Sequence, residues 1–167
     1  MCGIVGYIGD KRAAPILING IKRLEYRGYD SSGISLIEDN KILCEKSVGF
    51  VSELEKKLNG RFDEGTLGIV HTRWATHGAP TIENAHPHID CTGNISIVQN
   101  GIIENYKYLK AKLEKEGHSF KSETDSEVIA HLVESHCEGV LEDAVRLALK
   151  EVEGAYGLAI ISLEDPG

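Results

Sequence analysis

The pattern that most limits the possible folds is a pair of apolar runs, 34–37 and 42–48, on either side of four polar residues at 38–41. Two such runs around a short polar turn predict a β-hairpin, which pairs strands antiparallel. Other short apolar runs predict further strands at 2–9, 67–73, 95–99 and 155–163. An early hairpin with strands on both sides of it therefore favours sheets that are largely antiparallel.

Helical spacing of apolar residues appears first after the opening strand and then mainly in the last third of the chain. It predicts helices over 14–24, 52–58, 106–116, 127–136 and 141–152. We expect Asp10 to cap the first of these, and Thr124 or Asp125 to cap the fourth. Strands first and helices concentrated later indicate an α+β fold in place of a doubly wound parallel sheet.

Length, charge and apolar content argue against two classes of protein, those that bind nucleic acids and those that span a membrane. The chain has 167 residues, enough for one sizeable core, and 26 acidic against 18 basic residues give a net charge of −8. No uninterrupted basic run is present, so nucleic acid is not expected as a partner. No apolar stretch approaches the ~20 residues that a bilayer requires, so a membrane span is not expected either.

Four cysteines lie far apart and form no Cys-x-x-Cys pair. This usage favours reduced thiols and a cytoplasmic protein. Cys44 and Cys137 have apolar neighbours, as inert core cysteines do. Cys2 is different because it directly follows Met1.

Removal of Met1 would leave a thiol and a free α-amine on Cys2. An α-amine titrates near ~7.7–8.0, so it can take the thiol proton and return it to a leaving group. The two groups together are a nucleophile and its base. The alternative is a cysteine that stands near the start of the chain by chance.

A dense group of hydrogen-bond donors follows the strand at 67–73. Arg73 offers a planar fork suited to a carboxylate, Thr76 and His77 add directional hydrogen bonds, and Trp74 can cover a small ligand. The stretch from 74 to 94 is irregular, and so long a loop in a compact domain is usually functional. Alternatively, Trp74 is a core aromatic residue and Arg73 pairs with a surface acid.

Asn100 and Gly101 come at the end of the strand predicted at 95–99. An amide side chain and a glycine N–H can both point at one oxygen, which is the arrangement of an oxyanion hole. Asn-Gly is also a common hairpin turn, so the turn stays open as an alternative.

A rival reading is a zinc-stabilised binding module. His77, His86, His88 and Cys91 are zinc-ligand types, although their spacing is irregular. Because the spacing is irregular, we expect no metal; we also expect no cofactor.

Six segments resemble, in order, the amino-terminal class II glutamine amidotransferase (glutaminase) domains of glutamine–fructose-6-phosphate aminotransferases. They are CGIVGYIG at 2–9, LEYRGYDSSG at 24–33, HTRWATHG at 71–78, ENAHPH at 83–88, NGIIEN at 100–105 and SETDSE at 122–127. The resemblance implies an N-terminal-nucleophile hydrolase fold, a four-layer α/β/β/α sandwich with two antiparallel sheets between helices.

The resemblance also implies residue roles. Cys2 would be the nucleophile, and Asn100 and Gly101 the oxyanion-hole residues. Glutamine recognition would fall to Arg73 for the α-carboxylate, to Asp125 for the α-ammonium, to Thr76 and His77 for other polar groups, and to Trp74 in a loop that closes over glutamine. Arg27 matches a position beside the nucleophile.

The expected reaction is hydrolysis of the glutamine amide, and the ammonia would convert fructose 6-phosphate to glucosamine 6-phosphate in a full-length homo-oligomeric enzyme. Two departures from the family pattern stand out. Gln99 replaces the usual histidine, and the chain is expected to be a truncated part of the first domain that lacks the sugar-isomerase domains. Amidophosphoribosyltransferases share the nucleophile chemistry expected of Cys2, so they remain an alternative.

Overall fold

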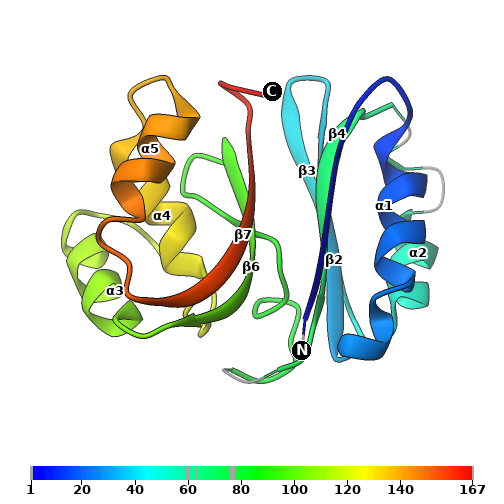
Figure 1. Ribbon diagram of the computed structural model, residues 1–167, viewed down its shortest axis with the longest axis horizontal. Coiled ribbons are helices and arrows are strands. Elements are labelled where there is room, and N and C mark those ends of the chain that lie inside the picture. The colour runs from blue at the N-terminus through cyan, green and yellow to red at the C-terminus, as the bar shows by residue number, and fades with distance from the viewer. Residues whose placement is uncertain (1, 59–60, 63, 76–77, 167) are drawn as a thin grey trace.

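The computed structural model describes residues 2–58, 61–62, 64–75 and 78–166. Figure 1 shows four layers: two helices, a sheet, a second sheet and three further helices. Every strand pairing is antiparallel. The α+β sandwich expected from the sequence is therefore confirmed.

The first sheet has the strand order β1-β4-β2-β3. Its strands are β1 (Gly3–Ile8), β2 (Ser31–Glu38), β3 (Lys41–Val48) and β4 (Leu67–Arg73). The predicted hairpin is β2 and β3. Asp39 and Asn40 connect them with positive φ angles of 51° and 55°, a backbone conformation that these two residue types tolerate better than most.

One face of this sheet is covered by α1 (Ala13–Lys22) and α2 (Val51–Leu58), and the short 3-10 helix η1 (Glu25–Arg27) follows α1. The predicted apolar stripe forms the core here, because Leu17 and Ile21 are fully buried. The predicted cap is wrong. The N-cap position is Arg12, without a side-chain bond, and the N–H of Ala13 donates to the Gly65 carbonyl at 2.8 Å.

The second sheet has the order β5-β6-β7. Its strands are β5 (His88–Ile89), β6 (Ile95–Ile103) and β7 (Gly154–Ser162), and its outer face is covered by α3 (Tyr106–Lys115), α4 (Glu127–His136) and α5 (Leu141–Ala148). Strand β6 continues past residue 99, so the hairpin turn considered for Asn100 and Gly101 is wrong.

The capping prediction for α4 is also wrong. Ser126 occupies the N-cap position without a side-chain bond to the helix. The Asp125 carboxylate instead accepts the N–H of Ile103 at 2.8 Å, while the Thr124 hydroxyl lies 3.0 Å from His88 Nε2. Asp125 therefore ties the start of α4 to the end of β6.

The inner faces of the two sheets meet in the middle of the sandwich. Ile69, Val98 and Ile161 are buried at this interface. The Ser96 hydroxyl donates to the Ser35 hydroxyl across it at 2.8 Å. Among the described residues, no helix is both long and apolar enough to span a membrane.

Candidate active site

Cys2 directly precedes β1, and the antiparallel pairing of β1 with β4 brings it beside the carboxyl end of β4. The N–H of Trp74 donates to Cys2 Sγ at 3.3 Å. A small cavity opens here. It is lined by Cys2, Arg73, Trp74, His86, Gln99, Gly101, Thr124, Asp125 and Ser126. Residues far apart in the sequence therefore gather around one thiol.

Five of the predicted site residues line this cavity, namely Cys2, Arg73, Trp74, Gly101 and Asp125. Asn100 contacts Cys2 directly and is described below. Thr76 and His77, together with Met1, lie outside the described residues. Arg27 is not among the residues that line the cavity; it ends η1, which contacts β4.

The side chain of Asn100 bridges Cys2 and His71. Its Nδ2 donates to the Cys2 carbonyl oxygen at 3.3 Å, and its Oδ1 lies 2.9 Å from His71 Nε2. Because an amide oxygen only accepts, His71 carries its proton on Nε2. The amide nitrogen has two hydrogens, so one remains to donate to an oxyanion next to Cys2.

His71 is fully buried, and burial lowers its pKa to about 4, although the hydrogen bond to Asn100 opposes that shift. The ring is therefore neutral at pH 7. A histidine with this pKa and with its Nε2 proton held by Asn100 is a poor general base. Its role in this arrangement is to orient the amide of Asn100.

Gly101 has a φ angle of 121°, a conformation that residues with a Cβ rarely adopt. A Cβ at this position would also lie 2.1 Å from the carbonyl oxygen of Ala155 on β7. Glycine is therefore required by the pairing of β6 with β7, and its bare backbone faces the cavity beside Asn100.

Arg73 is only 4% exposed. Its guanidinium donates to the carbonyls of Gly78 and Ala79, both at 3.3 Å. Burial lowers the pKa of Arg73, while the nearby Cys2, Asp30 and Asp125 act in the opposite direction. The alternative of a surface ion pair is wrong, because the charged group lies inside the site.

Trp74 is 45% exposed, so the core-aromatic alternative for this residue is wrong as well. Its ring packs edge-on against Tyr29 with a centroid distance of 5.8 Å, and Tyr29 stacks on Phe50 at 5.4 Å. The tryptophan therefore borders the cavity at the protein surface, as a side chain that covers a ligand would.

Comparison with known proteins gives the family. A family model described as a glutamine amidotransferase domain matches residues 71–166, more than half of the chain. The chain belongs to the glutamine amidotransferase domain family. The prediction drawn from the six sequence motifs is confirmed.

Curated relatives are named glutamine–fructose-6-phosphate aminotransferase [isomerizing]. The chain is 53% identical to the one from Pyrococcus horikoshii over 99% of its own length, and 54% identical to the one from Aquifex aeolicus over the same share. It spans only 28% of the length of each of these relatives.

Solved structures of the same class resemble the domain in three dimensions. The glutamine phosphoribosylpyrophosphate amidotransferase from B. subtilis, complexed with ADP and GMP, superposes with a TM-score of 0.82 at 28% identity. The match covers 98% of this chain and 35% of that chain. This likeness confirms the N-terminal-nucleophile hydrolase fold.

The structure of this amidotransferase domain separates Cys91 from His86 and His88, with which the zinc hypothesis grouped it; His77, the fourth member, lies outside the described residues. The rings of His71, His86 and His88 pack in a row, with centroid distances of 4.2 and 4.6 Å. Burial lowers the pKa of His88 to about 3 and that of His86 well below its usual value. Cys91 contacts His118 and His131 instead, so its grouping with His86 and His88 is wrong.

Sequence reasoning missed the role of Asp30. Its carboxylate accepts the N–H of Ala75 at 2.8 Å, and its own N–H donates to the Arg73 carbonyl at 3.1 Å. Gly28 lies against the same backbone, since a Cβ there would be 2.8 Å from the Trp74 nitrogen. Asp30 and Gly28 hold the segment that carries Arg73 and Trp74; both belong to the 24–33 motif, which was the available signal.

Gln99 takes part in the wall of the amidotransferase cavity. Its Oε1 accepts the hydroxyl hydrogen of Ser126 at 2.6 Å. Its buried Nε2 has no hydrogen-bond partner among the described residues. The side chain that stands in place of the family's usual histidine is therefore held by Ser126, which lies in the 122–127 motif although the motif did not reveal this contact.

Proposed function

We propose that this chain binds L-glutamine and hydrolyses its side-chain amide through a thioester on Cys2. The observation that supports this function best is the meeting of a thiol, a buried guanidinium and a carboxylate in one cavity, with Asn100 and Gly101 beside the thiol. A free amino acid carries both charges that such a cavity complements.

Recognition is assigned by charge. Arg73 pairs with the α-carboxylate through its planar fork, and Asp125 accepts the α-ammonium. Thr76 and His77 remain proposed contacts for the remaining polar groups. The cavity has a volume of about 30 Å³, room for about one water molecule, so Trp74 and the Arg73 contacts to residues 78 and 79 shift when glutamine enters.

The chemistry needs Met1 to be removed, so that Cys2 has a free amine. The amine takes the thiol proton, and Sγ attacks the amide carbon. Asn100 Nδ2 and the Gly101 backbone stabilise the oxyanion. The C–N bond breaks as the amine returns the proton to departing ammonia. Water then attacks the γ-glutamyl thioester, and glutamate leaves with the thiol restored.

In the full-length protein we propose that the ammonia aminates fructose 6-phosphate to give glucosamine 6-phosphate, in the cytoplasm. The identity of 53–54% to relatives with that activity in their names supports this acceptor over phosphoribosylpyrophosphate, whose amidotransferase is 28% identical. An acceptor screen on the full-length protein decides between them. Residues 1–167 alone should produce no glucosamine 6-phosphate.

The function is tested by measuring glutamate release from glutamine by the processed chain and by its Cys2→Ala variant. Activity should fall to background in the variant, because no thioester can form. Cys137→Ala is the matched control, since that thiol packs beside the helices of the second sheet and should leave the rate unchanged. Equal rates for the wild type and Cys2→Ala would refute the proposal.

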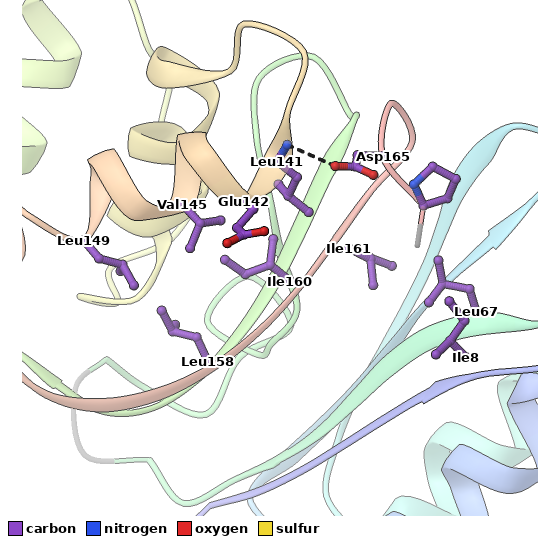
Figure 2. Close-up of a pocket in the computed structure, with 11 residues that line it drawn as sticks. Ile8, Leu67, Leu141, Glu142, Val145, Leu149, Leu158, Ile160, Ile161 and Asp165 are labelled. Carbon is purple, nitrogen blue, oxygen red and sulfur yellow. Dashed lines mark hydrogen bonds between the residues drawn. The ribbon is translucent and has the colours of Figure 1, made fainter.

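We also propose that residues 1–167 are part of a longer glutaminase domain whose continuation covers an apolar groove. Figure 2 shows the groove between α5, the end of β1, the start of β4 and the second half of β7. Its volume is about 670 Å³, and its apolar side chains include Leu67, Leu149, Leu158 and Ile160. So large an apolar hollow at the surface commonly marks a site that another segment covers.

This domain proposal is tested by the fluorescence of an apolar dye such as anilinonaphthalene sulfonate. The 167-residue chain should bind the dye, and Leu158→Glu should weaken that binding. A chain that includes the following residues of the full-length protein should not bind it. Equal dye binding by the short and extended chains would contradict the proposal.

A further inference from the structure

Four side chains of zinc-ligand type converge at a place that is separate from the glutamine cavity. They are Cys91, just after β5; His118, between α3 and α4; and His131 and Glu134, one turn apart on α4. One potential ligand atom from each lies within 4.8 Å of all the others. Cys91 precedes β6, whereas Asn100 and Gly101 lie in its second half, so the two places are near opposite ends of that strand.

The separations between the ligand atoms run from 3.0 to 3.8 Å, which brackets the spacing of a tetrahedral zinc site. Cys91 Sγ lies 3.5 Å from His131 Nδ1 and 3.8 Å from His118 Nδ1. The Glu134 Oε2 atom lies 3.0 Å from His118 Nδ1 and 3.3 Å from His131 Nδ1. Bonds of ~2.3 Å to sulfur and ~2.0–2.1 Å to nitrogen or oxygen would place tetrahedral ligands about 3.3–3.6 Å apart.

Hydrogen bonds alone account for these contacts less well. Each ring Nδ1 faces both the sulfur and the same carboxylate oxygen. A neutral Nδ1 that donates its hydrogen to Glu134 has no lone pair for the thiol, and one that accepts from the thiol has no hydrogen for Glu134. Each of the two rings can therefore form only one of its two contacts as a hydrogen bond, so two of the four contacts remain unexplained. A single cation bound by all four ligand atoms explains every contact.

The buried ring of His131 is oriented for metal binding. Its Nε2, on the far side from the cluster, lies 3.7 Å from a carboxylate oxygen of Glu127. That carboxylate is fixed by the N–H groups of Lys121 and Ser122. The separation of 3.7 Å is a charge-pair distance and not a hydrogen bond, and Nε2 has no hydrogen-bond partner among the described residues. The nearby carboxylate still favours the ring proton on Nε2, which leaves the Nδ1 lone pair directed at Cys91 and Glu134.

The sulfur also has the surroundings of a ligand thiolate. The N–H of Ser119 points at Cys91 Sγ at 3.4 Å, and the N–H of Cys91 donates to Glu134 Oε2 at 3.1 Å. Cys91 is exposed, so an ion can reach the cluster from solvent. A soft sulfur ligand with two imidazoles selects zinc over magnesium or calcium.

We propose that Cys91, His118, His131 and Glu134 bind one zinc ion. Four protein ligands fill a tetrahedral shell, so the ion is structural: it ties the turn before β6 and the α3–α4 connection to α4. The site is independent of the proposed glutaminase chemistry, and it assigns to Cys91 a set of partners that the sequence spacing did not reveal.

The direct test is titration of the metal-free chain with zinc ions alone, followed by competition with a chromophoric chelator. Cys2→Ala serves as the background, because a free thiol and amine on Cys2 form a competing chelate. The expected result is one zinc per chain. In the Cys2→Ala background, Cys91→Ser, His118→Ala or Glu134→Gln should each weaken zinc binding at least ~100-fold. This loss exceeds the one expected when a residue that only hydrogen-bonds to a ligand is removed.

The matched control is Cys137→Ser, which removes a thiol outside the cluster and should leave zinc affinity unchanged. If the ligand variants fail to fold, cobalt titration of the Cys2→Ala chain decides: a tetrahedral site with sulfur gives intense visible bands and a thiolate-to-metal charge-transfer band. Zinc binding unaffected by Cys91→Ser, or a cobalt complex without those bands, would overturn the proposal.

Discussion

Arg73 carries a positive charge in a place where little water can reach it, beside Cys2 and Asp125. We predict that Arg73→Ala weakens glutamine binding by ~1.5–3 kcal/mol, or about one to two decades in Kd, because one charge-assisted interaction is lost. Isothermal calorimetry with the Cys2→Ala background measures this without turnover.

Arg73→Lys is the matched comparison. Lysine keeps the charge but not the planar fork, so its loss of affinity should be intermediate. Circular dichroism checks that both variants fold, since the guanidinium also holds the carbonyls of Gly78 and Ala79. Unchanged glutamine affinity in a folded Arg73→Ala variant would show that the carboxylate is bound elsewhere.

At the scale of single residues, the sequence predicted which residues belong to the site better than it predicted the contacts that hold them in place. The resemblance selected Cys2, Arg73, Asn100 and Asp125, and the fold brings them together. It did not reveal that Asn100 is held by His71, because that bond joins residues 29 apart on two different sheets. Such contacts depend on how the sheets stack, which local patterns do not encode.

At the scale of elements, the pairing of β6 with β7 depends on Gly101. We predict that Gly101→Ala lowers the free energy of unfolding by at least about 2 kcal/mol, because a side chain would meet the Ala155 carbonyl in an unfavourable backbone conformation. Urea denaturation of both proteins measures the difference.

Gly157→Ala is the control for this effect. Gly157 pairs with Asn100 in the same ladder, yet a Cβ there would meet no atom within 4 Å. Alanine in a strand interior is more favourable than glycine by roughly 0.5–1 kcal/mol, so this variant should be as stable as the wild type or more so. Equal destabilisation by the two substitutions would refute the steric explanation.

The elements themselves were largely predictable. The run at 67–73 became β4 with the same bounds, and the helix at 127–136 became α4 likewise. Strand β6 was predicted too short, because Asn100 and Gly101 resemble a turn while the ladder with β7 continues to Ile103. The caps failed because of tertiary contacts: the Asp125 carboxylate binds the N–H of Ile103, and the N–H of Ala13 binds the Gly65 carbonyl.

At the scale of the whole molecule, the row of buried histidines makes stability depend on pH. The folded pKa of His71 is about 4, below the value of about 6.5 for an exposed histidine, so the unfolded chain binds more protons between these values. Stability is therefore complete above about pH 6.5 and decreases as the pH falls towards 4, by about 1.4 kcal/mol per pH unit for each such histidine.

We predict that His71→Gln makes this dependence shallower by up to about 1.4 kcal/mol per pH unit between pH 6 and 4.5. Urea denaturation curves at several pH values give the slope for each protein. His86 and His88 still contribute in the variant, because burial lowers their pKa values too. An unchanged slope would mean that His71 is protonated in the folded state.

The position of Cys2 directly after Met1 gives the proposed reaction its most specific requirement, a free α-amine on Cys2. With Met1 attached, that nitrogen is an amide and accepts no proton. The decisive measurement is glutamate release by the chain with and without Met1, each form confirmed by intact mass. We predict that the Met1-bearing form is slower by at least ~10²-fold, the usual contribution of general acid–base assistance, although it folds normally. Equal rates in the two forms would contradict the role of the amine and show that another base activates Cys2.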